Sequence, residues 1–97
     1  MSTYVMLVNY TDQGIRTIKD SPKRLAGVKK LATRLKGKLK SFYLTLGTYD
    51  IVAVFELPND EAAAKLSLSI GAQGNVRTTT LKAFSESEYR RIAAAVG

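Results

Sequence analysis

The stretch Gly47-Thr48-Tyr49-Asp50 brings a glycine, a phenol and a carboxylate into consecutive positions. Tyr49 could donate a hydrogen bond to a ligand or stack on it, and Asp50 could act as a base or as a polar anchor. The same residue types also suit a turn, because Gly47 can adopt a positive φ and Asp50 can bond the backbone of the turn. We predict a structural turn at Gly47 and keep Tyr49 and Asp50 as candidate ligand-binding residues.

Four other polar residues are candidates for a small-molecule site: Asn9, Gln13, Tyr43 and Arg77. Asn9 and Gln13 follow the first predicted strand, and strand ends often line ligand sites. Arg77 could hold a ligand carboxylate or phosphate through two hydrogen bonds, or it could pair with an acidic residue of this chain or of a partner chain. Tyr43, Asp50 and Arg77 would together suit a small-molecule site, but their spacing in the sequence does not establish that they meet.

The chain contains no histidine and no cysteine. Imidazole bases, thiolate nucleophiles and most zinc or copper sites are therefore excluded, and we predict no metal. The sequence also has no phosphate-binding glycine motif and no nucleophile elbow. We accordingly predict no cofactor and assign no catalytic residue. These observations leave open whether the protein is an enzyme, with the balance against catalysis.

The formal net charge is +7, and basic residues are concentrated between positions 19 and 40. This charge favours an anionic partner of some kind. The basic run contains no aromatic residue, and charge alone gives only salt-sensitive, non-specific binding to nucleic acid, so we do not expect a nucleic-acid partner. No apolar run approaches the ~20 residues of a membrane helix, and no signal peptide is recognisable. We expect a cytoplasmic protein with no membrane partner.

Hydrophobic periodicity predicts a single domain over residues 1–97. Strands are expected at 3–9, 38–46, 51–57 and 75–83, and helices at 21–36, 59–70 and 85–96, with a short helical turn before the first helix. Thr11 or Asp12, Asn59 and Ser85 suit N-cap positions, the last in a capping box with Glu88.

Two finer predictions concern the end of the first helix and the strand that follows it. Gly37 suits a left-handed residue that ends the helix. Simple alternation in the strand at 38–46 places Leu39 and Tyr43 on one face, and Phe42 and Leu44 on the other.

The order β-α-β-β-α-β predicts an α+β fold of the ferredoxin-like, split βαβ type, with a four-stranded antiparallel sheet and an extra helix at 85–96. Right-handed crossovers place two helices on one face of the sheet and leave the other face open. The strands at 3–9 and 51–57 are apolar on both sides. A large exposed apolar face usually marks a partner, so we predict a homodimer or an assembly of dimers. The alternative is that the last helix covers this face in a monomer.

The chain resembles the GYD domain family in a series of short motifs that span nearly its whole length. The motifs are Tyr4-Val5, Val8-Asn9, Thr11-Asp12-Gln13-Gly14-Ile15, Asp20-Ser21-Pro22-Lys23-Arg24, Ser41-Phe42-Tyr43, Gly47-Thr48-Tyr49-Asp50 and Gly74-Asn75-Val76-Arg77-Thr78. Proteins that look like this are small bacterial chains placed among the dimeric α+β barrels. The resemblance therefore implies that fold and a dimer, and it leaves the activity open.

The Gly-x-Tyr-Asp hairpin is also similar to one in the effector-binding domains of leucine-responsive transcription regulators. Those domains bind small molecules near subunit interfaces. This chain has no DNA-binding helix-turn-helix, so the likeness extends to the sensing half alone. The two-sided apolar sheet and the polar residues at strand ends lead us to predict a homo-oligomeric, non-enzymatic small-molecule-binding or sensing module. The alternatives are a cofactor-independent enzyme, such as an oxygenase or isomerase acting on a small apolar substrate, and a basic nucleic-acid-associated protein.

Overall fold

The computed structural model describes all residues from Met1 to Gly97. The elements, in chain order, are β1 (Ser2–Tyr10), α1 (Asp12–Arg16), the short 3-10 helix η1 (Ile18–Asp20), α2 (Ser21–Arg34), β2 (Lys38–Leu44), β3 (Ile51–Leu57), α3 (Asp60–Ala72), β4 (Val76–Ala83) and α4 (Glu86–Ala94).

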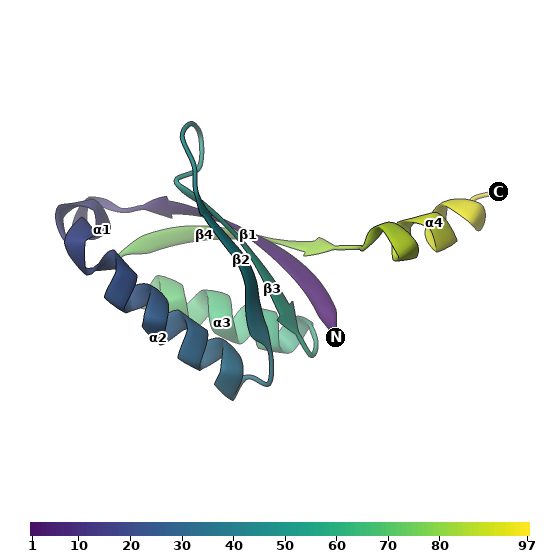
Figure 1. Ribbon diagram of the computed structural model, residues 1–97, viewed down its shortest axis with the longest axis horizontal. Helices are drawn as coiled ribbons and strands as arrows, with labels where there is room; N and C mark the ends of the chain where they lie inside the picture. The colour runs from purple at the N-terminus through teal and green to yellow at the C-terminus, as the bar shows by residue number, and fades with distance from the viewer.

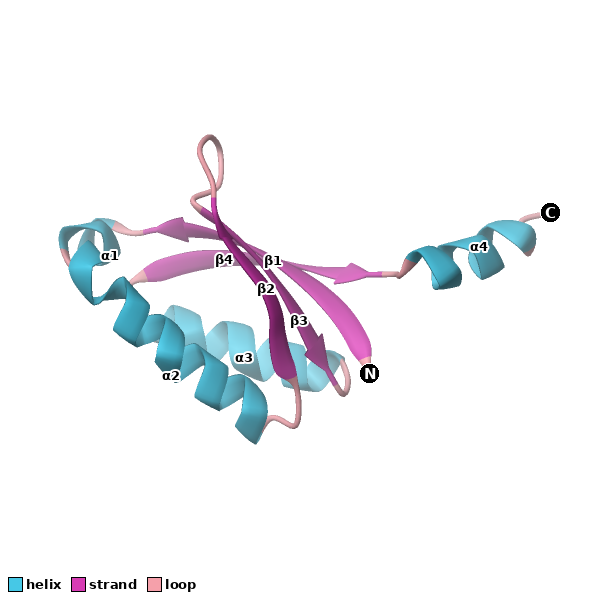
Figure 2. Cartoon of the chain, viewed as in Figure 1, coloured by secondary structure: helices cyan, strands magenta, loops and turns pink.

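The four strands form one sheet in the order β2-β3-β1-β4, with every neighbouring pair antiparallel. Helices α2 and α3 lie side by side on one face of this sheet, and the opposite face carries no helix (Figure 1). Figure 2 shows the same two layers by secondary structure. This arrangement confirms the predicted ferredoxin-like α+β fold. None of the helices is both long and apolar enough to cross a membrane.

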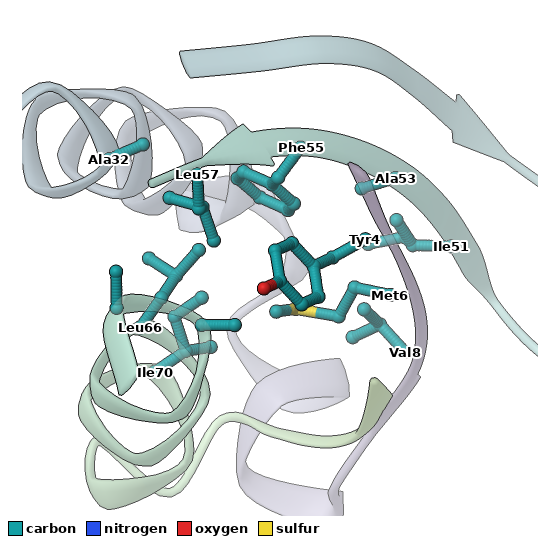
Figure 3. Packing of buried hydrophobic residues seen from close by; sticks show 12 residues of the cluster. Tyr4, Met6, Val8, Ala32, Ile51, Ala53, Phe55, Leu57, Leu66 and Ile70 are labelled. Atoms are coloured by element: carbon teal, nitrogen blue, oxygen red, sulfur yellow. The ribbon is translucent and has the colours of Figure 1, made fainter. Parts of the chain in front are cut away.

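The hydrophobic core lies between the sheet and the two long helices (Figure 3). Alternate residues of β1 and β3 point into it, because successive side chains of a strand face opposite sides of a sheet. Leu66 of α3 is fully buried against this layer. Truncating a buried leucine to alanine typically costs about 2–5 kcal/mol, so this helix is fixed to the sheet mainly by packing. We call this side of the sheet the inner face.

A β-bulge at Lys40 corrects the predicted alternation of β2. The pairing register with β3 shifts between Leu39 and Ser41, so one extra residue separates them. Leu39 therefore lies opposite Phe55 on the inner face, and Phe42, which was expected on the opposite side from Leu39, also lies on the inner face, opposite Ala53. A bulge reverses alternation in this way because the additional residue takes no partner in the ladder.

Side-chain caps begin three helices at the predicted residues. Thr11 accepts a hydrogen bond from the backbone of Gly14, and Asn59 accepts one from Ala62. Ser85 and Glu88 form the reciprocal capping box in front of α4. The local sequence signals thus define where α1, α3 and α4 begin.

The end of α2 differs from the prediction in which residue is left-handed. Lys36, not Gly37, has the positive φ, at 66°. Gly37 instead donates from its backbone to the carbonyl of Ala32, which completes a Schellman-type ending. A Cβ on Gly37 would lie 2.2 Å from the carbonyl oxygen of Glu56. Glycine is needed here for close approach to β3 and not for backbone handedness.

Helix α4 stands apart from the two-layer body, at the end of an extension of β4 (Figure 1). Its expected apolar stripe is exposed: Tyr89 is 63% exposed, Ile92 43% and Val96 74%. The helix therefore does not cover the open face of its own sheet.

Replacing Gly14 by alanine tests the contact that holds α1 against the start of β4. A Cβ at this buried position would lie 1.9 Å from the carbonyl oxygen of Asn75. We expect a loss of about 1–3 kcal/mol in the free energy of unfolding, because backbone must shift to admit the methyl group. Gly27→Ala is the matched control, since no atom lies within 4 Å of its added Cβ. The control should gain about 0.5–1 kcal/mol from helix propensity. Equal effects of the two substitutions in urea denaturation would contradict this packing.

Candidate functional site

The loop at residues 45–50 joins β2 to β3 and carries the glycine-tyrosine-aspartate stretch. Gly47 has a φ of 124°, a conformation that other residues adopt only with strain. Thr45 donates from its backbone to the carbonyl of Asp50, and its hydroxyl donates to the carbonyl of Tyr49 at 2.6 Å. The side chain of Tyr49 makes no hydrogen bond within the chain. The loop is thus fixed by its own backbone, while the phenol of Tyr49 stays available.

Asp50 ties this loop to the end of β1. Its carboxylate accepts a hydrogen bond from the backbone N–H of Tyr10 at 2.9 Å, and its own N–H donates to the carbonyl of Val8. The regular pairing of β1 with β3 ends at Val8 and Ile51. The aspartate therefore satisfies a backbone donor that the ladder no longer reaches. This geometry supports the turn interpretation of Asp50, and it leaves the other carboxylate oxygen free.

Gln13 lies on α1 and binds the turn between α3 and β4. Its side-chain nitrogen donates to the carbonyl of Gln73 and to the side-chain oxygen of Asn75, at 3.1 and 3.0 Å. Thr11 reinforces this contact, because its hydroxyl donates to the carbonyl of Gly74. The amide of Gln13 is thus engaged in joining two segments that are distant in sequence.

The remaining candidates lie on the outer face of the sheet, which we define as the side opposite α2 and α3. Asn9 and Arg77 are directly paired across β1 and β4. Tyr43 lies on β2, at the other edge of the sheet. Three strand spacings, about 14 Å, separate the two edges, so Tyr43 and Arg77 do not form one small-molecule site within a single copy. Arg77 makes no ion pair, and Glu56 is instead paired with Lys38 and Lys40.

The centre of the outer face is apolar. The four residues that occupy it are Val5, Leu7, Val52 and Val54, which alternate with core residues along β1 and β3. All four are only half-buried, and Leu81 on β4 extends the patch, with 46% of its surface exposed. This patch and the apolar residues of α4 are both uncovered in a single copy. Such surfaces usually mark an interaction site.

A cavity of about 80 Å³ opens between α2 and the inner face. Apolar side chains supply most of its lining, among them Phe42, Leu25 and Val28, whereas its polar lining residues are Tyr10, Ser21, Arg24, Gln73 and Asn75. No aspartate or glutamate lines it. An apolar cavity with a few polar groups at one end is a typical small-molecule site.

Sequence reasoning did not identify Arg24 as a site residue, because it stands in a run of basic residues that is typical of a solvated helix face. Phe42 was also missed as a cavity residue, since the bulge that turns it inward has no clear sequence signal. No spacing pattern distinguishes Arg24 from Lys23 or Lys29; only the fold places it beside the apolar lining.

Two titratable groups have clearly shifted pKa values, and neither lines this cavity. Burial raises the pKa of Tyr4 above its ordinary value, and the hydrogen bond to the carboxylate of Asp60 adds to the rise. The backbone N–H of Ser85 lowers the pKa of Glu88 in the capping box. No group of acidic residues is arranged to hold a metal ion. The two pKa shifts are thus explained by burial in the core and by helix capping.

Removing the carboxylate of Asp50 tests its structural role. Asp50→Ala leaves the N–H of Tyr10 without an acceptor, so the free energy of unfolding should fall by about 1–3 kcal/mol. Asp50→Asn keeps an acceptor oxygen and should recover most of the loss. Thr48→Ala, at an exposed position in the same loop, is the control and should change little. Urea denaturation measures all three, and wild-type stability of Asp50→Ala would show that the turn does not depend on this carboxylate.

Comparison with known proteins gives two matches. A family model described as the GYD domain matches residues 4–93. A protein of Thermus thermophilus, named glutamine synthetase and cystathionine beta-lyase binding protein, is 33% identical over 84 residues, which are 86% of this chain and 88% of that protein. The family match runs from β1 into α4 and so includes the whole two-layer body. The chain therefore belongs to the GYD domain family.

Proposed function

We propose that this protein is a homo-oligomeric, non-enzymatic binding module that attaches to metabolic enzymes and also binds a small molecule. The observation that carries the proposal is the uncovered apolar outer face, in a fold that presents no catalytic constellation. The name of the Thermus relative, which refers to the binding of two enzymes, supports protein partners for this chain as well. We place this activity in the cytoplasm, where such enzymes would be met.

A second copy of the chain is the occupant that best fits the outer face. Each copy offers an apolar sheet patch and the detached helix α4 (Figure 1), on which Tyr89 and Ile92 are exposed and after which Val96 is exposed too. In a two-fold dimer, every contact occurs twice: if α4 of one copy packs on the sheet of its partner, α4 of the partner packs on the sheet of the first copy. Association would thus cover both features at once.

The basic surface of α2 is the part of the molecule best suited to an enzyme partner. Its exposed cations, which make no ion pair within the chain, are Lys23, Lys29, Lys30 and Arg34. Unpaired charges of one sign accelerate encounter with a surface of opposite charge. Helix α2 lies on the side of the sheet opposite the outer face (Figure 1), so a second copy on the outer face would leave α2 accessible to an enzyme.

The alternative function is a cofactor-independent enzyme that acts on a small apolar substrate. The cavity under α2 is the natural place for such a reaction, because it is largely apolar. A carboxylate base of raised pKa would favour catalysis there. The lining contains no carboxylate, and this composition favours binding over catalysis.

The oligomeric state of the purified protein tests the role of the outer face. Sedimentation equilibrium at about 10 µM, within the range of stable interfaces, should give twice the chain mass of 10.6 kDa or a multiple of it. Leu81→Glu and Ile92→Glu each place a charge in the proposed contact and should shift the protein toward monomer. Leu68→Glu is the control, because Leu68 is equally apolar and 75% exposed but lies on α3. A wild-type monomer would contradict the proposed assembly.

Surface plasmon resonance with purified glutamine synthetase and cystathionine beta-lyase of the protein's own organism tests enzyme binding. We expect saturable binding to at least one of them, weakening as salt rises from about 50 to about 300 mM. The double variant Lys29→Glu/Lys30→Glu should lower the association rate about tenfold, whereas Lys29→Arg/Lys30→Arg keeps the charge and should not. Absence of binding to both enzymes would reject these partners. If the charge reversal left the association rate unchanged, the enzyme would bind a surface other than α2.

A further inference from the structure

The cavity between α2 and the sheet has the size and polarity of a site for a short organic molecule. Its volume is about 80 Å³. A single water needs about 10–15 Å³ by the same kind of measure, so the space corresponds to about five to eight water-sized groups. Side chains from β1, β2, β3, α2 and α3 supply the apolar walls. A branched aliphatic chain or one aromatic ring would fill this space.

All the polar lining residues belong to segments that meet at one end of the sheet. Tyr10 ends β1, Ser21 and Arg24 lie in the first turn of α2, and Gln73 and Asn75 lie between α3 and β4. The hydroxyl groups of Tyr10 and Ser21 are 3.1 Å apart and hydrogen-bonded to each other. The side-chain nitrogen of Asn75 donates no hydrogen bond within the chain. The cavity therefore has an apolar interior and a polar end with free donors.

Arg24 is the only charged residue of this lining, and it has no acidic partner. Its guanidinium donates to the carbonyl and the hydroxyl of Thr17, both at 3.1 Å, and to the carbonyl of Gly14 at 3.3 Å. A guanidinium has five N–H donors, so two are left. Every observed acceptor is neutral, although the side chain is half-buried. A partly dehydrated cation with spare donors favours an incoming anion.

We propose that this cavity binds a small monocarboxylic acid, with its branched or aromatic body among the apolar side chains and its carboxylate on Arg24. The proposal gives a ligand class to the small-molecule part of the proposed function, and it rests on that part alone. A neutral ligand would leave the arginine without a counter-charge. A free amino acid would bring an ammonium group, for which the lining offers no carboxylate. The site therefore selects simple carboxylic acids over both.

A two-dimensional NMR titration of the whole protein with three matched probes tests the ligand class. The probes are 3-phenylpropanoate, 3-phenylpropanamide and phenylalanine, which share an aromatic ring and differ in charge. We expect 3-phenylpropanoate to shift the signals of Leu25, Val28 and Ile70, and the other two to bind at least about tenfold more weakly. The amide has no negative charge to pair with Arg24, and phenylalanine adds an ammonium group for which the lining offers no carboxylate. Equal affinity for the amide would overturn the role of Arg24. No shift with any probe at millimolar concentration would overturn the site.

Two variants distinguish the contribution of Arg24 to ligand binding from that of the apolar cavity. Arg24→Gln should weaken binding of 3-phenylpropanoate at least about tenfold and abolish the preference over the amide. Arg24 also holds the end of α1, so its replacement could disturb the local structure. Val28→Phe is therefore a second test, because the larger side chain fills the cavity while Arg24 is kept. This variant should bind none of the probes. Lys19→Gln, which removes an exposed cation just before α2, is the control and should bind normally. Unchanged binding by Val28→Phe would overturn the proposal. These titrations need no enzyme partner, so failure here and failure of enzyme binding are distinguishable.

Discussion

Strands β1 and β3 at the centre of the sheet are apolar on both faces, and the rest of the structure depends on how each face is covered. The inner face is buried by α2 and α3, which supply Ala32, Leu66 and Ile70 to the core. Burial of apolar surface contributes about 25 cal/mol per Å², so this layer provides most of the stability available to a chain of this size. The outer face has no such cover within one copy. The self-association that we propose would meet, on this face, the same physical requirement that forms the core.

Close backbone contacts fix one end of the sheet, where the polar part of the cavity lies. Asp50 binds the end of β1, and Gly14 packs directly on the backbone of Asn75. These contacts hold the polar end of the cavity, where Arg24 meets the turn after α3. Because α2 packs on the inner face, its exposed basic residues and the outer face lie on opposite sides of the sheet. The three binding surfaces that we propose, namely the outer face, the basic surface of α2 and the cavity, thus occupy separate parts of one small domain.

Periodicity and capping residues predicted the elements, because alternation in β1 and β3 and the caps at Asn59 and Ser85 are local effects. Three features escaped prediction because they depend on contacts between distant segments. The bulge at Lys40 turns Phe42 inward. The close approach of Gly37 to Glu56 replaces the expected left-handed glycine. Arg24 acquires its place at the cavity only when α2 packs on the sheet, since its sequence surroundings are those of any basic helix. The predicted small-molecule residues are divided among the outer face, α1 and the loop at residues 45–50 for the same reason.

The most direct test of the central claim is an isotope-filtered NOE experiment on a mixture of labelled and unlabelled copies. It detects only contacts between two copies. A dimer formed through the outer face should give intermolecular NOEs from the methyl groups of Val5, Leu7 and Val54, including contacts to the ring of Tyr89 or the methyl groups of Ile92. Intermolecular NOEs from α2 or α3 instead, or none because the sample is monomeric, would show that the outer face is not the dimer contact.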